Sequence, residues 1–384
     1  MSLNNKEPSV LQVLPELNTG GVERGTVDLA IYARSKGLRV IVVSSGGRMV
    51  EKLDELGGEH ICLDLKTKNP VKIIRNIFKL KKICKLNNVR IIHARSRAPA
   101  WSAYYAAKLL RIPFITTFHG FYKNNFPLKR YYNAIMTKGD KVIAVSDFVR
   151  EHVFDNYSID PKKVMVIHRG VDLTEFDPKR IYGEQITRFK EEKFIPLNVP
   201  VILLPGRITR WKGQDVAIKA VAEIKEKEFV LAVAGKSGKN ENYLKELVQM
   251  VGKHELEKKV KFINDVKDMP LAYAASDIVL STSVEPETFG RVSSEAASMG
   301  KPVIATNHGG SKEILVNGKT GYLVPPEDHI ELANKIEYLL NLISDEKTKQ
   351  QFAIDCRKHV SESFSLQRMC ESTLNLYNQY YKFN

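Results

Sequence analysis

The chain has 384 residues, 43% of them hydrophobic, and a formal net charge of +15 at pH 7. This length exceeds one typical hydrophobic core, so we expect two domains. Residues 1–10 lack a basic region followed by an apolar stretch, and nowhere do about eighteen apolar residues run together, so we expect a cytoplasmic protein without a signal peptide or membrane span.

A glycine loop follows the first predicted strand. The strand runs from Val10 to Pro15, and Gly20 and Gly21 come shortly before a helical pattern that continues through Ala33. Paired glycines permit positive φ and let the backbone come close to a phosphate. Because this is the first strand-to-helix turn of a doubly wound domain, we expect both glycines to bind a ligand, although a tight turn without a ligand would need the same residues.

The block from Lys66 to Gly139 contains seventeen Lys and Arg and no Asp or Glu. It carries +17, and the rest of the chain carries about −2, which favours an anionic partner. That partner could be a membrane surface, an acidic glycan or nucleic acid, and ordinary solvated helix faces are the alternative. The segment from Phe121 to Tyr132 interleaves aromatic and basic residues, as an interfacial segment does. We therefore leave open a reversible position on the inner face of the plasma membrane.

A histidine ends a later strand of the same half. The predicted strand from Pro113 to Phe118 is followed by His119 and Gly120, at the edge where ligands gather in open α/β sheets. A histidine there can hydrogen-bond a sugar hydroxyl or polarise a phosphate near neutral pH, and a structural histidine is the alternative. Further strands of this half are predicted at 40–44, 90–95, 141–146 and 164–167.

The second half restarts with an apolar strand from Val201 to Pro205, and the loop after it carries Arg207 and Lys212. A guanidinium fork and an ammonium five residues apart suit one diphosphate, whereas solvated loop cations are the alternative. The next strand ends in another glycine turn at Gly235. Further strands are predicted at 260–263, 277–280 and 302–306.

Two carboxylates stand eight residues apart in the stretch from Ser281 to Thr306. Glu287 lies in a loop, and Glu295 lies in the helix that this loop enters through Phe289 and Gly290. Gly290 and the free amides of the helix N-terminus suit an anion. The two carboxylates can contact different parts of one ligand, although solvated charges on an ordinary βαβ unit would look similar.

This stretch resembles the E-x7-E signature of the family-four retaining glycosyltransferases, also described as glycosyl transferases group 1. The matching residues are Ser283, Glu287, Phe289, Gly290, Glu295, Ala296, Gly300, Pro302, Val303, Ile304 and Ala305. The G-R-x-x-x-x-K-G run that contains Arg207 and Lys212 is a second match. The family usually has Pro-Asn before Gly170-Val171-Asp172, so His168 and Arg169 are a departure whose role the resemblance leaves open.

The resemblance covers nearly the whole chain and implies the α/β GT-B fold, with two facing Rossmann-like doubly wound domains and a deep interdomain cleft. The N-terminal acceptor-side domain is expected at 1–178, completed by a C-terminal helix at 365–384. Residues 179–198, where periodicity fades and charge rises, are expected to form a linker. The nucleotide-sugar-binding domain is expected at 199–364.

The resemblance also implies the roles of the site residues. In the family, the residues equivalent to Glu287 and His119 lie beside the donor sugar, those equivalent to Arg207 and Lys212 neutralise the leaving nucleoside diphosphate, and the second Glu hydrogen-bonds the ribose. The predicted catalytic residues are thus Glu287, His119, Arg207 and Lys212. The predicted substrate-binding residues are Gly20, Gly21, Glu295, Phe289, Gly290, Gly235 and Val266, the last from the segment around Asp265 that holds the base.

The implied reaction is transfer of a hexosyl unit from a nucleotide diphosphate sugar, such as UDP- or GDP-hexose, to an acceptor hydroxyl with retention. The acceptor would be a glycan or lipid-linked molecule of lipopolysaccharide, glycolipid or other cell-envelope glycan synthesis. We expect no cofactor and no metal, because no D-x-D cluster stands out and the four cysteines have no C-x-x-C spacing. A nucleotide-sugar epimerase on the same architecture is the alternative, and a nucleic-acid-binding protein has less support because no recognised motif accompanies the basic block.

Overall fold

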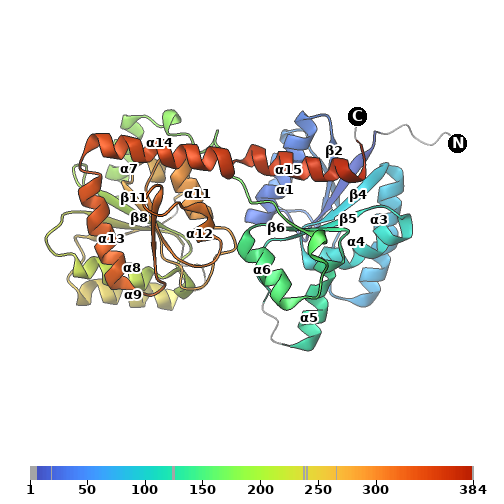
Figure 1. Cartoon of the computed structure of the whole chain (residues 1–384), viewed down its shortest axis with the longest axis horizontal. Helices are drawn as coiled ribbons and strands as arrows, with labels where there is room; N and C mark the ends of the chain where they lie inside the picture. The colour runs from blue at the N-terminus through green and yellow to red at the C-terminus, as the bar shows by residue number, and fades with distance from the viewer. Residues whose placement is uncertain are drawn as a thin grey trace. The chain divides into compact units, whose positions relative to one another are not determined.

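The computed structural model divides into two compact units, Met1–Arg169 with Leu366–Asn384 (unit 1) and Gly170–Ser365 (unit 2) (Figure 1). The structure describes residues 7–18, 20–122, 126–236, 238, 241–264 and 266–382. Thr19, residues 123–125 and Asp265 belong to segments discussed above and lie outside the described residues.

Unit 1 contains a seven-stranded parallel sheet with the order β3-β2-β1-β4-β5-β6-β7. The order reverses between β1 and β4, which is where open α/β sheets bind ligands. The strands are β1 (Ser9–Val13), β2 (Arg39–Ser44), β3 (Glu59–Cys62), β4 (Val89–Ala94), β5 (Phe114–Phe118), β6 (Lys141–Ala144) and β7 (Val164–Val166). The helices are α1 (Gly21–Ser35), α2 (Met49–Glu55), α3 (Pro70–Leu86), α4 (Arg97–Leu110), α5 (Pro127–Asn133), α6 (Asp147–Asn156) and α15 (Leu366–Tyr380), with 3-10 turns η1 (Ala134–Lys138) and η2 (Pro161–Lys163).

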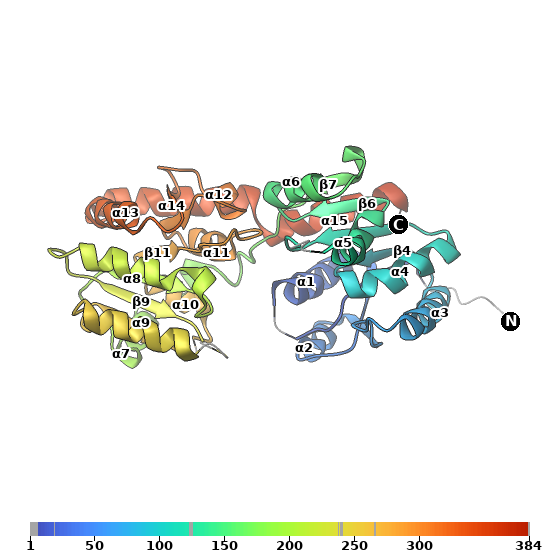
Figure 2. The same cartoon turned by 90° about the horizontal axis from the view of Figure 1, so that it is seen from below.

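Both faces of this sheet are covered, so its central strands are buried on two sides. On β1, Leu11 and Val13 join the core beneath α3 and α4, and Val10 joins a second core that contains residues of α1 and α15. Figure 2 shows α15, drawn in red, running beside the strands of unit 1. The C-terminal helix thereby completes the first unit, although it follows the second unit in sequence.

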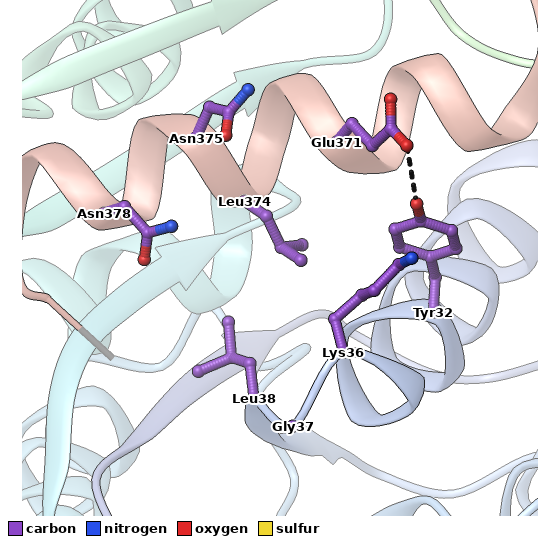
Figure 3. A pocket seen from close by; sticks show the side chains of 8 residues that line it. All are labelled: Tyr32, Lys36, Gly37, Leu38, Glu371, Leu374, Asn375 and Asn378. Carbon is purple, nitrogen blue, oxygen red and sulfur yellow. Dashed lines mark hydrogen bonds between the residues drawn. The ribbon is translucent and has the colours of Figure 1, made fainter. Parts of the chain in front are cut away.

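A cavity of about 320 Å³ remains where the end of α1 meets α15 (Figure 3). Across it, the hydroxyl of Tyr32 donates a hydrogen bond of 2.9 Å to Glu371 Oε1. The ammonium of Lys36 lies 5.5 Å from the centroid of the Tyr32 ring. The hydrogen bond from Tyr32 to Glu371 thus fastens α15 to α1 at the periphery of the buried core. The lining residues are Tyr32, Lys36, Gly37, Leu38, Glu371, Leu374, Asn375 and Asn378.

Unit 2 contains a six-stranded parallel sheet with the order β10-β9-β8-β11-β12-β13. Its strands are β8 (Val201–Pro205), β9 (Val230–Ala234), β10 (Val260–Ile263), β11 (Ile278–Ser281), β12 (Val303–Thr306) and β13 (Gly321–Val324). Its helices are α7 (Gly183–Glu192), α8 (Gln214–Glu223), α9 (Glu241–Lys253), α10 (Met269–Ala274), α11 (Arg291–Ser298), α12 (Ser311–Ile314), α13 (His329–Leu342) and α14 (Glu346–Ser363), with 3-10 turns η3 (Pro178–Arg180) and η4 (Arg210–Lys212).

The predicted α/β class with two Rossmann-like units is confirmed by these sheets and their flanking helices. The range 179–198, expected to be a linker, instead contains α7 and packs within unit 2. Phe189 of α7 is buried in the unit 2 core, and the other nine residues of the helix are not. Among the described helices, none is both long enough and apolar enough to cross a bilayer.

Candidate active site

Gly206 follows β8 and Gly235 follows the neighbouring strand β9, and the backbones of the two glycines are in close contact. Gly206, at φ +151°, donates its N–H to the carbonyl of Ala234 at 2.9 Å. A Cβ added to Gly235 would collide with the carbonyl oxygen of Gly206. Gly235 is therefore required for this close approach, and its predicted contact with substrate stays a prediction.

The three cations of this loop have different surroundings. Arg210 forms an ion pair with Glu246 at 2.6 Å, and its guanidinium lies 5.0 Å from the centroid of the Tyr243 ring. Arg207 is exposed, and its guanidinium makes no hydrogen bond or ion pair within the part of the chain that the structure describes. Arg210 is thus engaged on the surface, whereas Arg207 can reach a ligand without losing a described partner.

Lys212 and Glu287 are brought together from different loops. Lys212 Nζ donates to Glu287 Oε1 at 2.5 Å, and the hydroxyl of Ser283 donates to the same oxygen at 2.6 Å. Both side chains are largely shielded, with 14% of Lys212 and 11% of Glu287 exposed. The ammonium also lies 4.4 Å from the centroid of the Trp211 ring. Lys212, which is predicted to bind the diphosphate, therefore forms an ion pair with Glu287, the predicted catalytic carboxylate.

Backbone contacts hold the two loops in this register. Gly213 adopts φ +66°, and a Cβ there would collide with the carbonyl oxygen of Thr282. The hydroxyl of Thr282 lies 3.0 Å from the carbonyl oxygens of both Lys212 and Gly213. The N–H of Val284 donates to the carbonyl of Trp211 at 2.8 Å. The β8 and β11 loops are thus joined next to the Lys212–Glu287 pair.

The segment from Glu287 to Gly290 lies on the backbone of the loop that follows β12. Gly290 caps α11 at φ +96°, and a Cβ there would lie 2.8 Å from the Cα of Ser311. Gly310 donates its N–H to the carbonyl of Glu287 at 2.7 Å, and a Cβ on Gly309 would lie 2.8 Å from the nitrogen of Glu287. Sequence reasoning missed Gly309 and Gly310, although an adjacent glycine pair after a predicted strand was the available signal.

Phe289 and Val266 occupy less direct positions than the sequence analysis expected. Phe289 is 3% exposed, and its ring makes an edge contact with Phe364 at a centroid distance of 6.1 Å. Its side chain thus belongs to the core, and a substrate contact would have to use its backbone. Val266 packs partly buried against the unit 2 core, and its predicted role in holding the base stays a prediction.

Glu295 is 7% exposed and receives hydrogen bonds on both carboxylate oxygens. Arg291, one turn earlier on α11, donates to Oε1 at 2.6 Å, and the hydroxyl of Tyr273 on α10 donates to Oε2 at 3.1 Å. Burial, and then the charge of Glu295, raise the pKa of Tyr273 well above its usual value, so its hydroxyl remains a donor. Tyr273 carried no sequence signal that linked it to Glu295, whereas the spacing of four residues between Arg291 and Glu295 on one helix was an available signal.

The side chain of Arg169 contacts the backbone of the predicted glycine loop of unit 1. Gly20 precedes α1 in an extended conformation, and a Cβ there would collide with the carboxylate of Glu23. A Cβ on Gly21 would lie 2.6 Å from Nη1 of Arg169, and Nη2 of Arg169 donates a hydrogen bond to the carbonyl of Gly21. Arg169, the departure from the family pattern, is thus placed at the loop predicted to bind a ligand.

His119 follows β5, and both of its ring nitrogens are shielded from solvent. Burial lowers the pKa of His119 well below 6.5, and the positive charges of Arg95 and Arg169 lower it further. The imidazole is therefore neutral at pH 7, a form that can both donate and accept a hydrogen bond. Its predicted contact with the donor sugar stays a prediction.

His93 on β4 is a structural residue. It is fully buried, with Nδ1 at 2.6 Å from the Tyr377 hydroxyl and Nε2 at 2.7 Å from the Thr117 hydroxyl. It therefore ties α15 and β5 to the centre of the sheet. Arg95, two residues later, is 5% exposed and was not among the residues predicted to form the site.

Family models match both halves of the chain. One described as "Glycosyl transferases group 1" matches residues 185–358, and one described as "Glycosyltransferase Family 4" matches residues 19–175. The crystal structure of a glycosyltransferase from Rickettsia africae ESF-5 is 39% identical in sequence, with 99% of this chain and 100% of that chain covered and a TM-score of 0.92. Similarity to these proteins thus extends over both units.

Two further relatives are more distant. Anabaena Alr3699/HepE, solved in complex with UDP-glucose, is 23% identical, with a TM-score of 0.80 over 97% of this chain and 99% of that chain, which shows a shared fold. Spore coat protein SA of Bacillus subtilis (strain 168) is 27% identical over 250 residues, 62% of this chain and 65% of that protein. The match therefore spans just under two thirds of that curated relative's length.

Proposed function

This chain belongs to the group 1 glycosyltransferases, with the two Rossmann-like units of the GT-B fold, and on that premise we propose that it transfers a hexosyl unit from a nucleotide diphosphate sugar to an acceptor hydroxyl with retention. The observation that carries the proposal is the Lys212–Glu287 ion pair of 2.5 Å beside the exposed Arg207. The complex of the Anabaena relative with UDP-glucose supports a donor of the UDP- or GDP-hexose class.

In the proposed reaction, the bond between the anomeric carbon and the diphosphate oxygen breaks, and its electron pair leaves with the nucleoside diphosphate. Arg207, Lys212 and the N-terminal amides of α11 stabilise this developing negative charge. Lys212 exchanges part of its contact with Glu287 for the diphosphate. Glu287 then faces the sugar as its anomeric centre becomes positive, and the acceptor oxygen forms the new bond while its proton passes to the departing diphosphate oxygen.

The ribose of the donor is proposed to bind Glu295. Arg291 and Tyr273 fix both carboxylate oxygens, which lets Glu295 present a preformed acceptor to sugar hydroxyls without a rotamer search. Arg207 and Lys212 would supply the charge that a divalent metal supplies in other transferases, so we propose that the reaction needs neither a metal nor another cofactor.

The test begins with binding of UDP, GDP and ADP to the full chain, followed by assay of the hexose derivatives of the nucleotide that binds. We expect one nucleotide to bind at micromolar concentration and product to form only when an acceptor such as an extracted envelope glycolipid is present. Anomeric configuration of the product, read by NMR, tests retention, and an arm with EDTA tests metal independence. Conversion of the donor sugar without acceptor would instead favour the epimerase alternative, and absence of nucleotide binding would contradict the proposal.

The surface of unit 1 supports a lipid-linked acceptor. The basic helix α3 exposes Val71, Ile74 and Phe78 at 58%, 55% and 59%, and α5 exposes Leu128 at 83%. Apolar side chains among lysines and arginines are typical of segments that lie in the interface of an anionic membrane. We therefore propose that unit 1 binds such a membrane and meets its acceptor there, in lipopolysaccharide, glycolipid or other envelope glycan synthesis.

Vesicle co-sedimentation at low and high salt tests this membrane proposal. Binding should require anionic lipid and weaken with salt, because each cation near the surface contributes roughly 1 kcal/mol. Ile74→Ser with Phe78→Ser should reduce binding, as should Lys129→Ser with Arg130→Ser on α5. The matched control is Val248→Ser with Ile330→Ser, two exposed apolar residues of unit 2 at 52% and 49%. Equal partitioning onto neutral and anionic vesicles would contradict the proposal.

A further inference from the structure

Arg95 is a buried cation at the point where the strand order of unit 1 reverses. It follows β4 directly and is 5% exposed. Its Nε has no hydrogen-bond partner, and its guanidinium makes no ion pair with a carboxylate among the described residues. The charge of Asp28 acts on it only through space. Because burial of a cation without a paired anion is costly, this residue needs an anion from elsewhere.

A second guanidinium reaches the same space. A Cβ built on Gly25 of α1 would lie 3.6 Å from Nη2 of Arg95 and 3.4 Å from Nη2 of Arg169. The first turn of α1 adds the positive end of a 15-residue helix. The charges of both arginines also lower the pKa of His119, which places its neutral imidazole within their electrostatic range. Gly25 has no side chain, so the Cβ position within contact distance of both guanidinium groups is not filled by this residue.

We propose that Arg95 and Arg169 bind an oxyanion of the acceptor, a carboxylate or a phosphate, and that the enzyme therefore prefers acidic acceptors. This inference rests on the proposed function, which already assigns the donor diphosphate to Arg207 and Lys212 in unit 2. Two guanidinium forks suit the planar or tetrahedral oxygens of such a group, and a neutral sugar would leave the buried charge of Arg95 without an anion. Arg169 stands where the family usually has Asn, so the preference is expected to be specific to chains with this substitution.

Isothermal titration of the full chain with glucuronic acid, glucose 6-phosphate and glucose tests the inference, and UDP serves as the probe of unit 2. Both acidic sugars should bind at least about tenfold more tightly than glucose, as expected for charge-assisted hydrogen bonds. The stronger of the two identifies carboxylate or phosphate as the preferred source. Arg169→Asn should lower the affinity for acidic sugars on the order of tenfold and leave the affinity for UDP unchanged.

Gly25→Ala is a steric test in the same space. Its methyl would sit at ordinary contact distance from both guanidinium groups, so the chain should fold, and alanine is the better helix former. It should nevertheless exclude the oxyanion and reduce binding of glucuronic acid as much as Arg169→Asn does. Unchanged binding in this variant would overturn the inference.

Thermal unfolding separates a binding role of Arg95 from a structural one. Arg95→Met removes an unneutralised buried charge, so its melting temperature should be equal to or above that of the wild type. Glucuronic acid or phosphate should raise the melting temperature of the wild type but not of Arg95→Met. Arg75→Met, an exposed arginine on α3, is the matched control and should behave as the wild type does. The inference would be overturned if Arg95→Met had a lower melting temperature than the wild type and glucuronic acid or phosphate still raised that temperature as in the wild type.

Transfer assays distinguish failure of this inference from failure of the proposed function. Equal transfer to methyl glucuronide and methyl glucoside would overturn the acidic preference while leaving the transferase assignment intact. An Arg169→Asn variant with weakened UDP binding would assign the arginines to the donor instead, which also overturns it. Binding of glucuronic acid that depends on Arg169, without transfer from any nucleotide sugar, would support the oxyanion site and contradict the proposed function.

Discussion

The candidate site residues of unit 2 and those of unit 1, called here the two half-sites, differ in how their charges are neutralised. In unit 2, Lys212 is paired with Glu287, and Arg291 and Tyr273 donate hydrogen bonds to Glu295, so the shielded charges are neutralised within the protein and the cation left without a described partner, Arg207, is exposed. In unit 1, Arg95 is buried without an ion pair to any carboxylate that the structure describes. Where side chains already pair with one another, a ligand must replace one of these partners when it binds. Where a buried charge has no partner, an oppositely charged ligand neutralises it.

This difference also separates what each half-site can contribute. In the proposed reaction, Lys212 would release Glu287 as it contacts the diphosphate, which would couple donor binding to activation of the carboxylate. Excess positive charge selects an anion but changes little when the anion binds, so it favours recognition over chemistry. The following predictions test this contrast.

The largest effect is expected for Lys212→Ala, because it removes a stabiliser of the leaving group and leaves the shielded carboxylate of Glu287 without its cation. We expect turnover to fall on the order of a hundredfold to a thousandfold, and Arg207→Ala to lower it about a hundredfold. Arg210→Ala is the matched control from the same loop, since this arginine is paired with Glu246 on the surface. Steady-state kinetics with saturating acceptor measure the effect, and near-normal activity in the Arg207→Ala, Lys212→Ala double variant would contradict both assignments.

The two carboxylates of unit 2 should separate turnover from donor affinity. Glu287→Ala should reduce turnover by tens of fold or more with a small change in donor affinity, because this residue is expected to face the reacting sugar. Glu295→Ala should mainly weaken donor binding, and Tyr273→Phe should do so by a smaller factor because the hydrogen bonds from Arg291 to Glu295 remain intact. Donor titration beside single-turnover kinetics distinguishes these effects. Equal losses of affinity in both Glu variants would sink the assignment.

Most strands, and the loops that carry the site motifs, were predictable because local pattern determines them. The apolar run before Arg207 and the glycine before α11 each form their turn from residues adjacent in sequence. The edge strands β3 and β13 had no prediction, since their half-buried tetrapeptides carry little periodicity. The helix α7 was missed for a related reason, because a charged helix with one buried residue resembles a linker.

Contacts between distant segments could not be predicted from a single sequence. The fold brings Tyr273 of α10 within hydrogen-bond distance of Glu295 on α11, and nothing near Tyr273 in the sequence marks it as a site residue. Arg95 looks like an ordinary cation at the end of a strand, and only its burial distinguishes it. The motif residues of unit 2 were predictable from the sequence, whereas Arg95 was one of many cations in the basic block of unit 1, and its burial arises from packing.

A backbone test addresses the rigidity of the unit 2 loop. Gly290→Ala imposes a left-handed φ of +96° on a side chain and places its Cβ 2.8 Å from the Cα of Ser311, so we expect a loss of roughly 1–3 kcal/mol of unfolding free energy. Gly318→Ala is the matched control, because Gly318 has φ +80° with no atom near its Cβ position and should show the conformational cost alone. Urea unfolding with each variant measures the difference. Equal costs at the two positions would show that the loop relaxes away from Ser311, and donor affinity should then survive the change.

The smallest effect concerns the pH dependence of unit 1. Burial, reinforced by the charge of Arg95, holds the pKa values of His93 and His119 well below 6.5. The unfolded chain takes up these protons near pH 6.5 and the folded chain does not, so the stability of unit 1 should decrease as the pH falls below 6.5, by up to about 1.4 kcal/mol per pH unit for each histidine. Above that pH both states are neutral and this contribution is constant. Trp101 lies in unit 1 and Trp211 in unit 2, so Trp211→Phe and Trp101→Phe variants let fluorescence follow urea unfolding of each unit at pH 7.5, 6.5 and 5.5. His119→Gln should make the slope of unit 1 shallower, and a slope that is unaffected by this change would contradict a neutral imidazole at His119 in the charged surroundings of unit 1.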